Sequence, residues 1–274
     1  MKRRTFLAAM AGGLFLGKPL QTWAKLAEEQ GLNVGIQMYS LRGYKAEEAI
    51  GHAHDIGFRH LEFYSGMYPT NATPEQIKAM NQLLADKGLK LSGHGVNRFS
   101  KDHDANRRLF EFAKAAGVRN LTADPDPDSF DSLEKLVEEF NIRIAIHNHG
   151  PRHRYNKVND VLSAVQDRHP LIGACADLGH YIRSAEEPTA VIRALDKRLF
   201  GVHLKDFAEK QDKTKGVILG KGHLDVEGVF QALKHVKFPA DGALSLEYEE
   251  NPKNPLDDIQ QCFNVAQAAL KKLS

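Results

Sequence analysis

The sequence predicts a single-domain α/β protein with a (β/α)8, or TIM, barrel fold. Short apolar runs alternate eight times, without a break, with longer amphipathic segments, which is the order that parallel strands joined by crossover helices produce. Some runs, such as residues 142–146, are apolar at nearly every position, as expected of a strand buried on both faces. Because no run precedes a glycine-rich dinucleotide-binding loop, a doubly wound open sheet is the less favoured alternative.

Turn residues mark the boundaries of the predicted elements. Thr73 precedes Pro74, which predicts a helix with the threonine as N-cap and the proline as first residue. Gly57, Gly88 and Gly117 each follow a predicted helix, where a left-handed residue commonly ends the helix. The predicted strands are residues 34–41, 60–64, 89–94, 118–123, 142–146, 171–176, 199–204 and 243–247. The predicted helices are residues 46–56, 74–87, 105–116, 132–140, 158–168, 188–197, 226–236 and 256–273.

Residues 1–24 have the features of a twin-arginine signal peptide. Arg3 and Arg4 precede an uncharged stretch rich in small and apolar residues, and the segment ends at Ala24, two positions after Thr22. The apolar run of roughly 11 residues is too short to span a bilayer. This order favours a signal peptide over an ordinary amphipathic helix. It predicts a periplasmic or other extracytoplasmic location for the barrel, residues 25–274.

The charge balance disfavours a nucleic-acid partner. The chain has 37 basic and 35 acidic residues, and residues 1–24 hold four of the bases and none of the acids, which leaves 33 bases, 35 acids and a net charge of about −2. Nucleic-acid binding relies on a clustered basic surface. We expect no stable membrane anchor after processing, while the sequence leaves a homo-oligomer open. Cys175 and Cys262 are expected to be free, buried thiols.

Candidate metal ligands lie at the carboxyl ends of the fifth to eighth predicted strands. In a barrel the carboxyl ends of the strands meet at one face, where active sites lie. Two imidazoles and two carboxylates balance a dication, and such a set suits Mn, Co, Zn or Mg better than a structural zinc. A single histidine could equally be a hydrogen-bonded core residue, and His149 competes with His147 for the strand-five position. The predicted ligands of one divalent ion are His147, Asp177, His203 and Glu247.

Seven short motifs lie at or after the predicted strands. They are Gln37-Met38-Tyr39-Ser40-Leu41-Arg42, His60-Leu61-Glu62-Phe63, His147-Asn148-His149-Gly150-Pro151, Asp177-Leu178-Gly179-His180, His203-Leu204-Lys205-Asp206, Gly220-Lys221-Gly222 and Glu247-Tyr248-Glu249. In this order the motifs resemble the xylose-isomerase-like barrel superfamily of sugar phosphate isomerases and epimerases. The resemblance covers residues 33–272.

The resemblance implies one divalent ion that chelates two oxygens of a sugar, while acids at the strand ends move a proton on the adjacent carbon. This chain departs from the family pattern because His147 stands where the epimerases carry a glutamate, which puts a symmetric two-glutamate epimerisation in doubt. Lys205 beside a cation is expected to have a lowered pKa. The predicted catalytic residues are Glu247, Glu62, Lys205 and His149, and the predicted substrate contacts are Tyr39, Arg42, His94, His180 and Glu249.

Some residues have a second, structural interpretation. Glu62 could be a hydrogen-bond acceptor on the barrel floor, and Asp206 could orient a neighbouring segment. The Gly220-Lys221-Gly222-His223 stretch could approach a ligand closely or be a flexible loop. Arg152 is a further candidate substrate contact.

The function predicted is that of a metal-dependent sugar isomerase or epimerase that abstracts a proton next to a metal-polarised carbonyl, with a small-molecule carbohydrate as substrate. The first alternative is a metal-dependent lyase or hydratase that cleaves keto-glycosides by β-elimination. A non-catalytic periplasmic sugar-binding barrel is the alternative of another class. The abasic-site endonuclease branch of the superfamily is disfavoured by the near-neutral chain and by His147.

Overall fold

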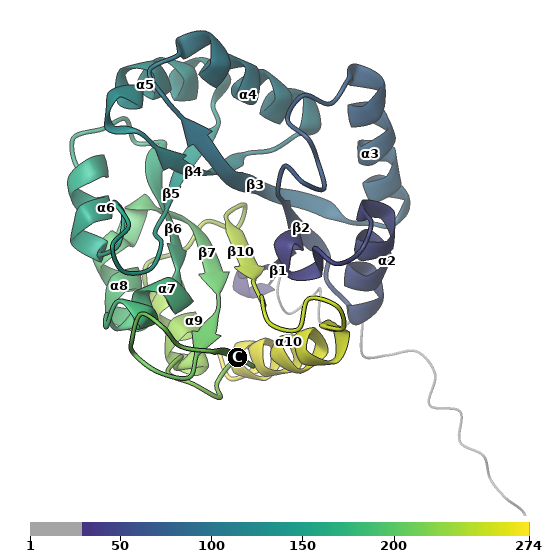
Figure 1. Ribbon diagram of the computed structural model, residues 1–274, viewed down its shortest axis with the longest axis vertical. Helices are drawn as coiled ribbons and strands as arrows, with labels where there is room; N and C mark the ends of the chain where they lie inside the picture. Colours follow the sequence, from purple (N-terminus) through teal and green to yellow (C-terminus); the bar gives the residue numbers. More distant parts are fainter. Residues whose placement is uncertain (1–28, 274) are drawn as a thin grey trace, which may run out of the picture.

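The computed structural model describes residues 29–273 and shows a closed, eight-stranded parallel barrel surrounded by helices (Figure 1). Neighbouring strands around the barrel follow the order β1-β10-β7-β6-β5-β4-β3-β2. The predicted barrel fold is therefore confirmed. The barrel strands are β1 (Val34–Gln37), β2 (His60–Phe63), β3 (Lys90–Phe99), β4 (Asn120–Pro125), β5 (Arg143–His147), β6 (Ile172–Asp177), β7 (Leu199–Leu204) and β10 (Ala243–Leu246).

The helices cover the outside of the barrel (Figure 1). Helix α3 begins as the sequence predicts, since Thr73 and Gln76 form a reciprocal capping box ahead of Pro74. Gly57 and Gly117 adopt left-handed conformations at the ends of α2 and α4. The α-helices are α2 (Ala46–Ile56), α3 (Pro74–Asp86), α4 (His103–Ala116), α5 (Phe130–Phe140), α6 (Val158–Val165), α7 (Leu178–Arg183), α8 (Pro188–Leu195), α9 (Val226–His235) and α10 (Leu256–Lys271).

Three features at the carboxyl end of the barrel differ from the prediction. Strand β1 ends at Gln37 and continues as a 3-10 helix, Met38–Leu41. Strand β3 extends five residues beyond the predicted end at His94, and its pairing with β4 shifts register between His94 and Asn97. The short helix α7 and an antiparallel hairpin of β8 (Asp206–Phe207) and β9 (Gly216–Val217) were not expected.

Apolar side chains fill the space between the strands and the helices, and nearly all of them belong to one buried cluster. Cys175 and Cys262 are both free and buried, as predicted. Among residues 29–273, no helix combines the length and apolar character that a membrane span requires. The predicted signal peptide, residues 1–24, lies outside the described residues.

Candidate metal centre and active-site cavity

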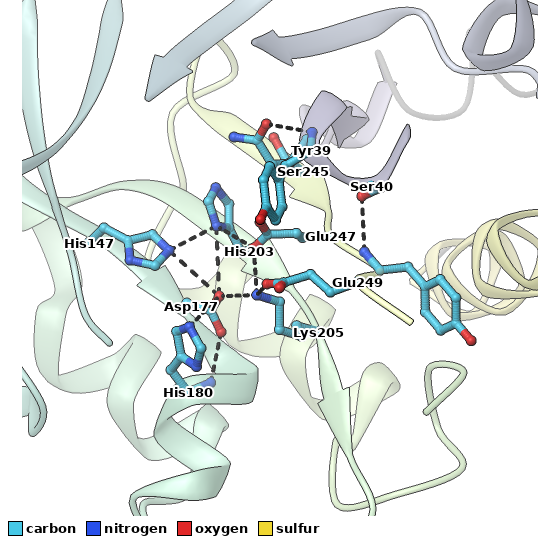
Figure 2. A network of polar contacts seen from close by, with 12 residues as sticks. Tyr39, Ser40, His147, Asp177, His180, His203, Lys205, Ser245, Glu247 and Glu249 are labelled. Carbon is cyan, nitrogen blue, oxygen red and sulfur yellow. Dashed lines mark hydrogen bonds and ion pairs between the residues drawn. The ribbon is translucent and has the colours of Figure 1, made fainter. Parts of the chain in front are cut away.

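The four predicted metal ligands converge at the carboxyl end of the barrel (Figure 2). His147 ends β5, Asp177 ends β6, His203 lies near the end of β7, and Glu247 directly follows β10. All four are buried, and one ligand atom from each lies within 4.8 Å of the others. This cluster can hold a metal ion.

The spacing of the ligand atoms suits a cation at their centre. His147 Nε2 lies 3.1 Å from His203 Nδ1 and 3.6 Å from Asp177 Oδ2, and His203 Nδ1 lies 3.1 Å from Glu247 Oε2. Two ligand atoms bound at about 2.1 Å to a tetrahedral ion lie about 3.4 Å apart. The buried Asp177 Oδ2 and Glu247 Oε2 face these imidazoles and the Lys205 ammonium. The donor set therefore fits a divalent ion.

The backbone around Asp177 fixes the direction of its carboxylate. Oδ1 accepts the backbone N–H of His180 at 2.7 Å and so caps the N-terminus of α7. Asn148 holds the same residue from β5, because its side chain accepts the Asp177 N–H and donates to the Asp177 carbonyl. With Oδ1 engaged in the cap, Oδ2 is left facing His147 and His203.

Glu62 lies directly behind His203 and is fully buried. Its Oε2 accepts hydrogen bonds from His203 Nε2 at 3.1 Å and Ser245 Oγ at 2.6 Å, and its Oε1 accepts one from Thr122 Oγ1 at 2.5 Å. Burial alone would raise the pKa of Glu62, but the neighbouring His203 and the three hydrogen bonds lower it. An ionised Glu62 keeps the proton of His203 on Nε2 and leaves Nδ1 free to bind a metal.

Lys205 introduces a positive charge beside the cluster. Its Nζ lies 2.9 Å from Asp177 Oδ2, 2.7 Å from Glu247 Oε2 and 2.6 Å from Glu249 Oε1. Burial would lower the pKa of Lys205, but these three carboxylates raise it well above its usual value. The sequence did not reveal these three carboxylates around one amine. The lowering of the pKa that we expect beside a bound cation stays a prediction.

The surroundings of His203 favour its protonated form. Burial would lower the pKa of His203, but Cys175, Glu62 and Glu247 raise it well above the usual value. Burial raises the pKa of Asp177, whereas His180 and Lys205 lower it further than burial raises it. A metal ion bound at this cluster would therefore replace a proton on the His203 imidazole.

Two adjoining cavities open beside the cluster, with volumes of about 360 Å³ and 310 Å³. They share His180, Lys205, Glu247 and Glu249. Such volumes lie at the small end of the range for ligand sites. The larger cavity is lined by Gln37, Tyr39, Tyr64, Ser65, Gly95, Val96, His147, His149, His180, His203, Lys205, Glu247 and Glu249. The smaller one is lined by His180, Arg183, Lys205, Asp206, Phe207, Asp212, Lys213, Thr214, Gly216, Val217, Glu247, Tyr248, Glu249 and Glu250.

Of the predicted catalytic and substrate-binding residues, most line this space. Tyr39, His149, His180, Lys205, Glu247 and Glu249 all do so. Burial, together with the neighbouring histidines, lowers the pKa of His149 to about 2, so this ring is neutral. Tyr39 is 38% exposed and packs edge-on against Tyr64, with ring centroids 5.2 Å apart. Glu62 instead lies behind the cluster.

His94 and Arg42 are placed outside the cavity lining. Because β3 continues to Phe99, His94 is in the middle of the strand, and its Nε2 contacts the carbonyl of Tyr68 at 2.9 Å. Gly95 permits this course, since a Cβ there would lie 2.3 Å from the carbonyl oxygen of Thr122. Arg42 donates to the backbone carbonyls of Tyr39 and Glu249 and so braces two lining residues.

Asp206 organises a loop and does not face the cluster. Its carboxylate accepts five backbone N–H groups, from Phe207, Gly220, Gly222, His223 and Leu224, at 2.8 to 2.9 Å. A Cβ at Gly222 would lie 2.1 Å from the Phe207 carbonyl oxygen, so the glycine is needed for packing against the chain itself. Arg152 is exposed and pairs with Asp212 at 2.7 Å.

Sequence reasoning missed lining residues that come from irregular segments. Tyr64 and Ser65 follow β2, and Phe207 belongs to the β8–β9 hairpin. The position of Tyr64 as the last residue of a predicted strand was a usable signal. Phe207 gave no such signal, because the hairpin depends on pairing across a loop of eight residues, 208–215.

The fold and the cluster together define a TIM-barrel protein with a candidate metal centre at the carboxyl ends of its strands. The chain matches the xylose isomerase-like TIM barrel family over residues 50–265, and it belongs to that family.

Two relatives are similar to this chain in sequence, and a solved structure is similar to it in fold. The 3-oxo-isoapionate decarboxylase of Pectobacterium atrosepticum is 27% identical over 180 residues, which cover 59% of this chain and 63% of that protein. The inosose dehydratase of Clostridium botulinum strain Alaska E43 is 28% identical over 262 residues, covering 77% of this chain and 85% of that protein. The crystal structure of a D-tagatose 3-epimerase-like protein is 16% identical, with a TM-score of 0.72 and coverage of 88% and 98%, and shows the shared fold alone.

Several of these matches are partial. The chain spans less than two thirds of the length of the decarboxylase and about half the length of three other clostridial inosose dehydratases that it matches.

Proposed function

We propose that this protein is a divalent-metal-dependent sugar isomerase or epimerase that acts by abstracting a proton next to a carbonyl. One observation carries the proposal. Four buried ligand side chains meet beside a cavity of ligand size, and three of them, His147, His203 and Glu247, line that cavity. The metal in question is Mn, Co, Zn or Mg, because the donors are imidazole nitrogen and carboxylate oxygen without thiolate. A carbohydrate substrate is supported by the names of the relatives.

A cation held by His147, Asp177, His203 and Glu247 would act as a Lewis acid toward a sugar carbonyl. The protein's own side chains would transfer the protons, stabilise the developing charge and position the substrate. Glu247 lines the cavity and takes the proton from the carbon beside that carbonyl. Lys205, as an ammonium between Asp177 and Glu249, stabilises the negative charge that develops and can donate a proton. Tyr39 and Tyr64 form an apolar wall that positions the ring.

The return of the proton is the step in which this chain differs from a two-glutamate epimerase. The strand-five position carries His147, so a second carboxylate is not available there. Lys205 and Glu249 line the same cavity as Glu247 and are the groups we assign to this second proton transfer, because the Lys205 ammonium has a proton to donate. His149 lines the cavity as well, but burial and the neighbouring histidines lower its pKa to about 2, so its neutral ring lacks the extra proton that this step requires.

A lyase or hydratase that cleaves keto-glycosides by β-elimination is the second candidate. The smaller cavity favours it, because that space adjoins the larger cavity across Lys205 and Glu247 and could receive a leaving group. Elimination begins with the same deprotonation, after which the bond to the oxygen one carbon further on breaks and that oxygen takes a proton. We also propose that Arg3 and Arg4 direct export, which places the reaction outside the cytoplasm.

Solvent exchange tests the shared step. The metal-loaded protein is incubated with candidate keto sugars and glycosides in deuterated water, and the products are analysed by NMR and mass spectrometry. Deuterium is expected at the carbon beside the carbonyl. A rearranged sugar of otherwise unchanged mass indicates isomerisation or epimerisation, and release of an aglycone or second sugar indicates elimination.

The matched pair Glu247→Gln and Glu138→Gln isolates the proton carrier. Glutamine at position 247 keeps the shape but cannot carry the proton, so exchange should fall about 100-fold or more, whereas the exposed Glu138 on α5 makes no contact with the site and its variant should behave as wild type. Turnover without solvent hydrogen at any carbon, after internal return has been excluded with a slow substrate, would overturn the proposal. Binding of sugar without any turnover or exchange would favour the sugar-binding barrel.

A further inference from the structure

A second group of ligand-type side chains lies next to the candidate metal centre. Asp124 lies near the end of β4, and His149 and His153 belong to the segment between β5 and α6. One ligand atom from each of these three residues lies within 4.8 Å of the others. His153 Nε2 is 3.6 Å from Asp124 Oδ2, close to the separation of about 3.4 Å between two ligands of one tetrahedral ion.

Two atoms of this group are buried and unpaired. Within residues 29–273, Asp124 Oδ1 and His153 Nδ1 are shielded from solvent and have no hydrogen-bond partner. Buried polar atoms normally find such a partner. The His149 ring packs against His153 with centroids 4.2 Å apart and against His147 with centroids 4.7 Å apart. The second group therefore adjoins the first without sharing its ligands.

The segment that carries the two histidines is fixed to β4. Arg154 donates to the Pro125 carbonyl at 2.7 Å and to Asp126 at 2.9 Å, and the Tyr155 hydroxyl donates to the same carbonyl at 2.8 Å. The backbone N–H of His149 donates to the Tyr155 carbonyl at 2.8 Å. These contacts hold both histidines beside Asp124 before any ligand binds, as a metal site requires.

We propose that Asp124, His149 and His153 bind a second divalent transition-metal ion beside the His147–Asp177–His203–Glu247 centre. Two imidazoles and one carboxylate select a transition metal such as Zn or Co over Mg or Ca. The positive charges of Arg98 and Arg154 lie near His153 and oppose a cation there. Asp126 pairs with Arg154 and offsets part of this charge.

Three protein ligands leave at least one coordination position open. His149 lines the larger cavity, so that position is at the cavity edge. In a role that rests on the proposed function, the ion would bind a substrate hydroxyl or a water molecule at this open position. The binding of the ion itself does not depend on which reaction the protein catalyses.

Cobalt titration tests the site. Purified protein is stripped of metal with a chelator, reloaded with Co²⁺ at increasing free concentration, and assayed for bound cobalt by elemental analysis and for the visible absorption of the bound ion. We expect two ions per chain in the wild type. We expect one ion per chain in Asp124→Asn and in His153→Gln, with the second step weakened about 100-fold or more.

Controls separate the two centres. His235→Gln changes an exposed histidine on α9 and should still bind two ions. Asp177→Asn removes a ligand of the first centre and should leave the ion at the second. Circular dichroism checks the fold of each variant. If Asp124→Asn unfolds, the number of ions bound by His153→Gln decides the test.

A wild type that saturates at one ion, lost in Asp177→Asn, would overturn the second site while the proposed function stands. Uptake of two ions by both Asp124→Asn and His153→Gln would overturn it as well. Failure of Asp177→Asn to change binding, together with loss of one ion in His153→Gln, would support the second site and count against the first.

Discussion

Replacing Glu62 by glutamine distinguishes a positioning role from a proton-transfer role. Glu62 contacts His203, Ser245 and Thr122, but it does not line either cavity. Glutamine has nearly the same shape, so one amide oxygen can still accept the N–H of His203. The substitution removes the charge and retains this hydrogen bond.

The magnitude follows from the change in the acceptor. A hydrogen bond to a charged group contributes about 1.5 to 3 kcal/mol and one between neutral groups about 0.5 to 1.5 kcal/mol. The midpoints of the two ranges differ by about 1.3 kcal/mol, close to the value of about 1.4 kcal/mol that corresponds to a factor of ten in an equilibrium constant. We therefore expect Glu62→Gln to weaken metal binding about tenfold, because His203 becomes a poorer ligand. Glu62→Ala removes the acceptor altogether and should weaken binding about 100-fold.

Competition with a chromogenic chelator measures the metal affinity, and activity is then measured at saturating metal. In the positioning role, saturating metal restores most of the activity of Glu62→Gln, and Glu138→Gln matches the wild type throughout. Unchanged metal affinity together with a loss of about 100-fold or more in kcat at saturating metal would refute this reasoning and assign Glu62 a proton-transfer role.

Three further predictions concern other parts of the chain. Asp206→Asn places an amide against backbone donors of the Gly220–Leu224 segment, so urea denaturation should show a loss of about 3 kcal/mol, and a change under about 0.5 kcal/mol would contradict the loop role. Burial, aided by Lys90, lowers the pKa of His60 to about 4. Because the unfolded chain then binds the proton more readily, the free energy of unfolding decreases as the pH falls from 6.5 toward 4. At pH 5 the wild type should have lost about 2 kcal/mol relative to a His60→Gln variant. Equal acid sensitivity of the two proteins would argue against this pKa. Changing Arg3 and Arg4 to lysine should hold the precursor in the cytoplasm, and unaltered export on cell fractionation would contradict the signal-peptide assignment.

The fold could be predicted because its signals are local. Each strand and helix has its own hydrophobic period and its own turn residues, such as Thr73 with Pro74, and the eightfold alternation restricts the topology. The metal-ligand cluster could be predicted for a related reason. The carboxyl ends of parallel barrel strands must meet at one face, so residues that end β5, β6 and β7 or follow β10 must lie close together.

The roles of single side chains near the cluster depended on the tertiary structure. His94 has the appearance of a strand-end residue, but the register shift between β3 and β4 places it against Tyr68. Glu62 and His203 are 141 positions apart, and only the closed barrel shows that one lies behind the other. The raised pKa of Lys205 likewise depends on carboxylates from two other strand ends.

The sequence by itself determined the barrel, the strand ends that face its mouth and the donor types available there, because these follow from periodicity within short segments. The tertiary structure decided which donors face the same point, which carboxylate positions His203 and which segments line the cavities. Those facts depend on strand register and on contacts between residues far apart in the chain, which no local pattern encodes.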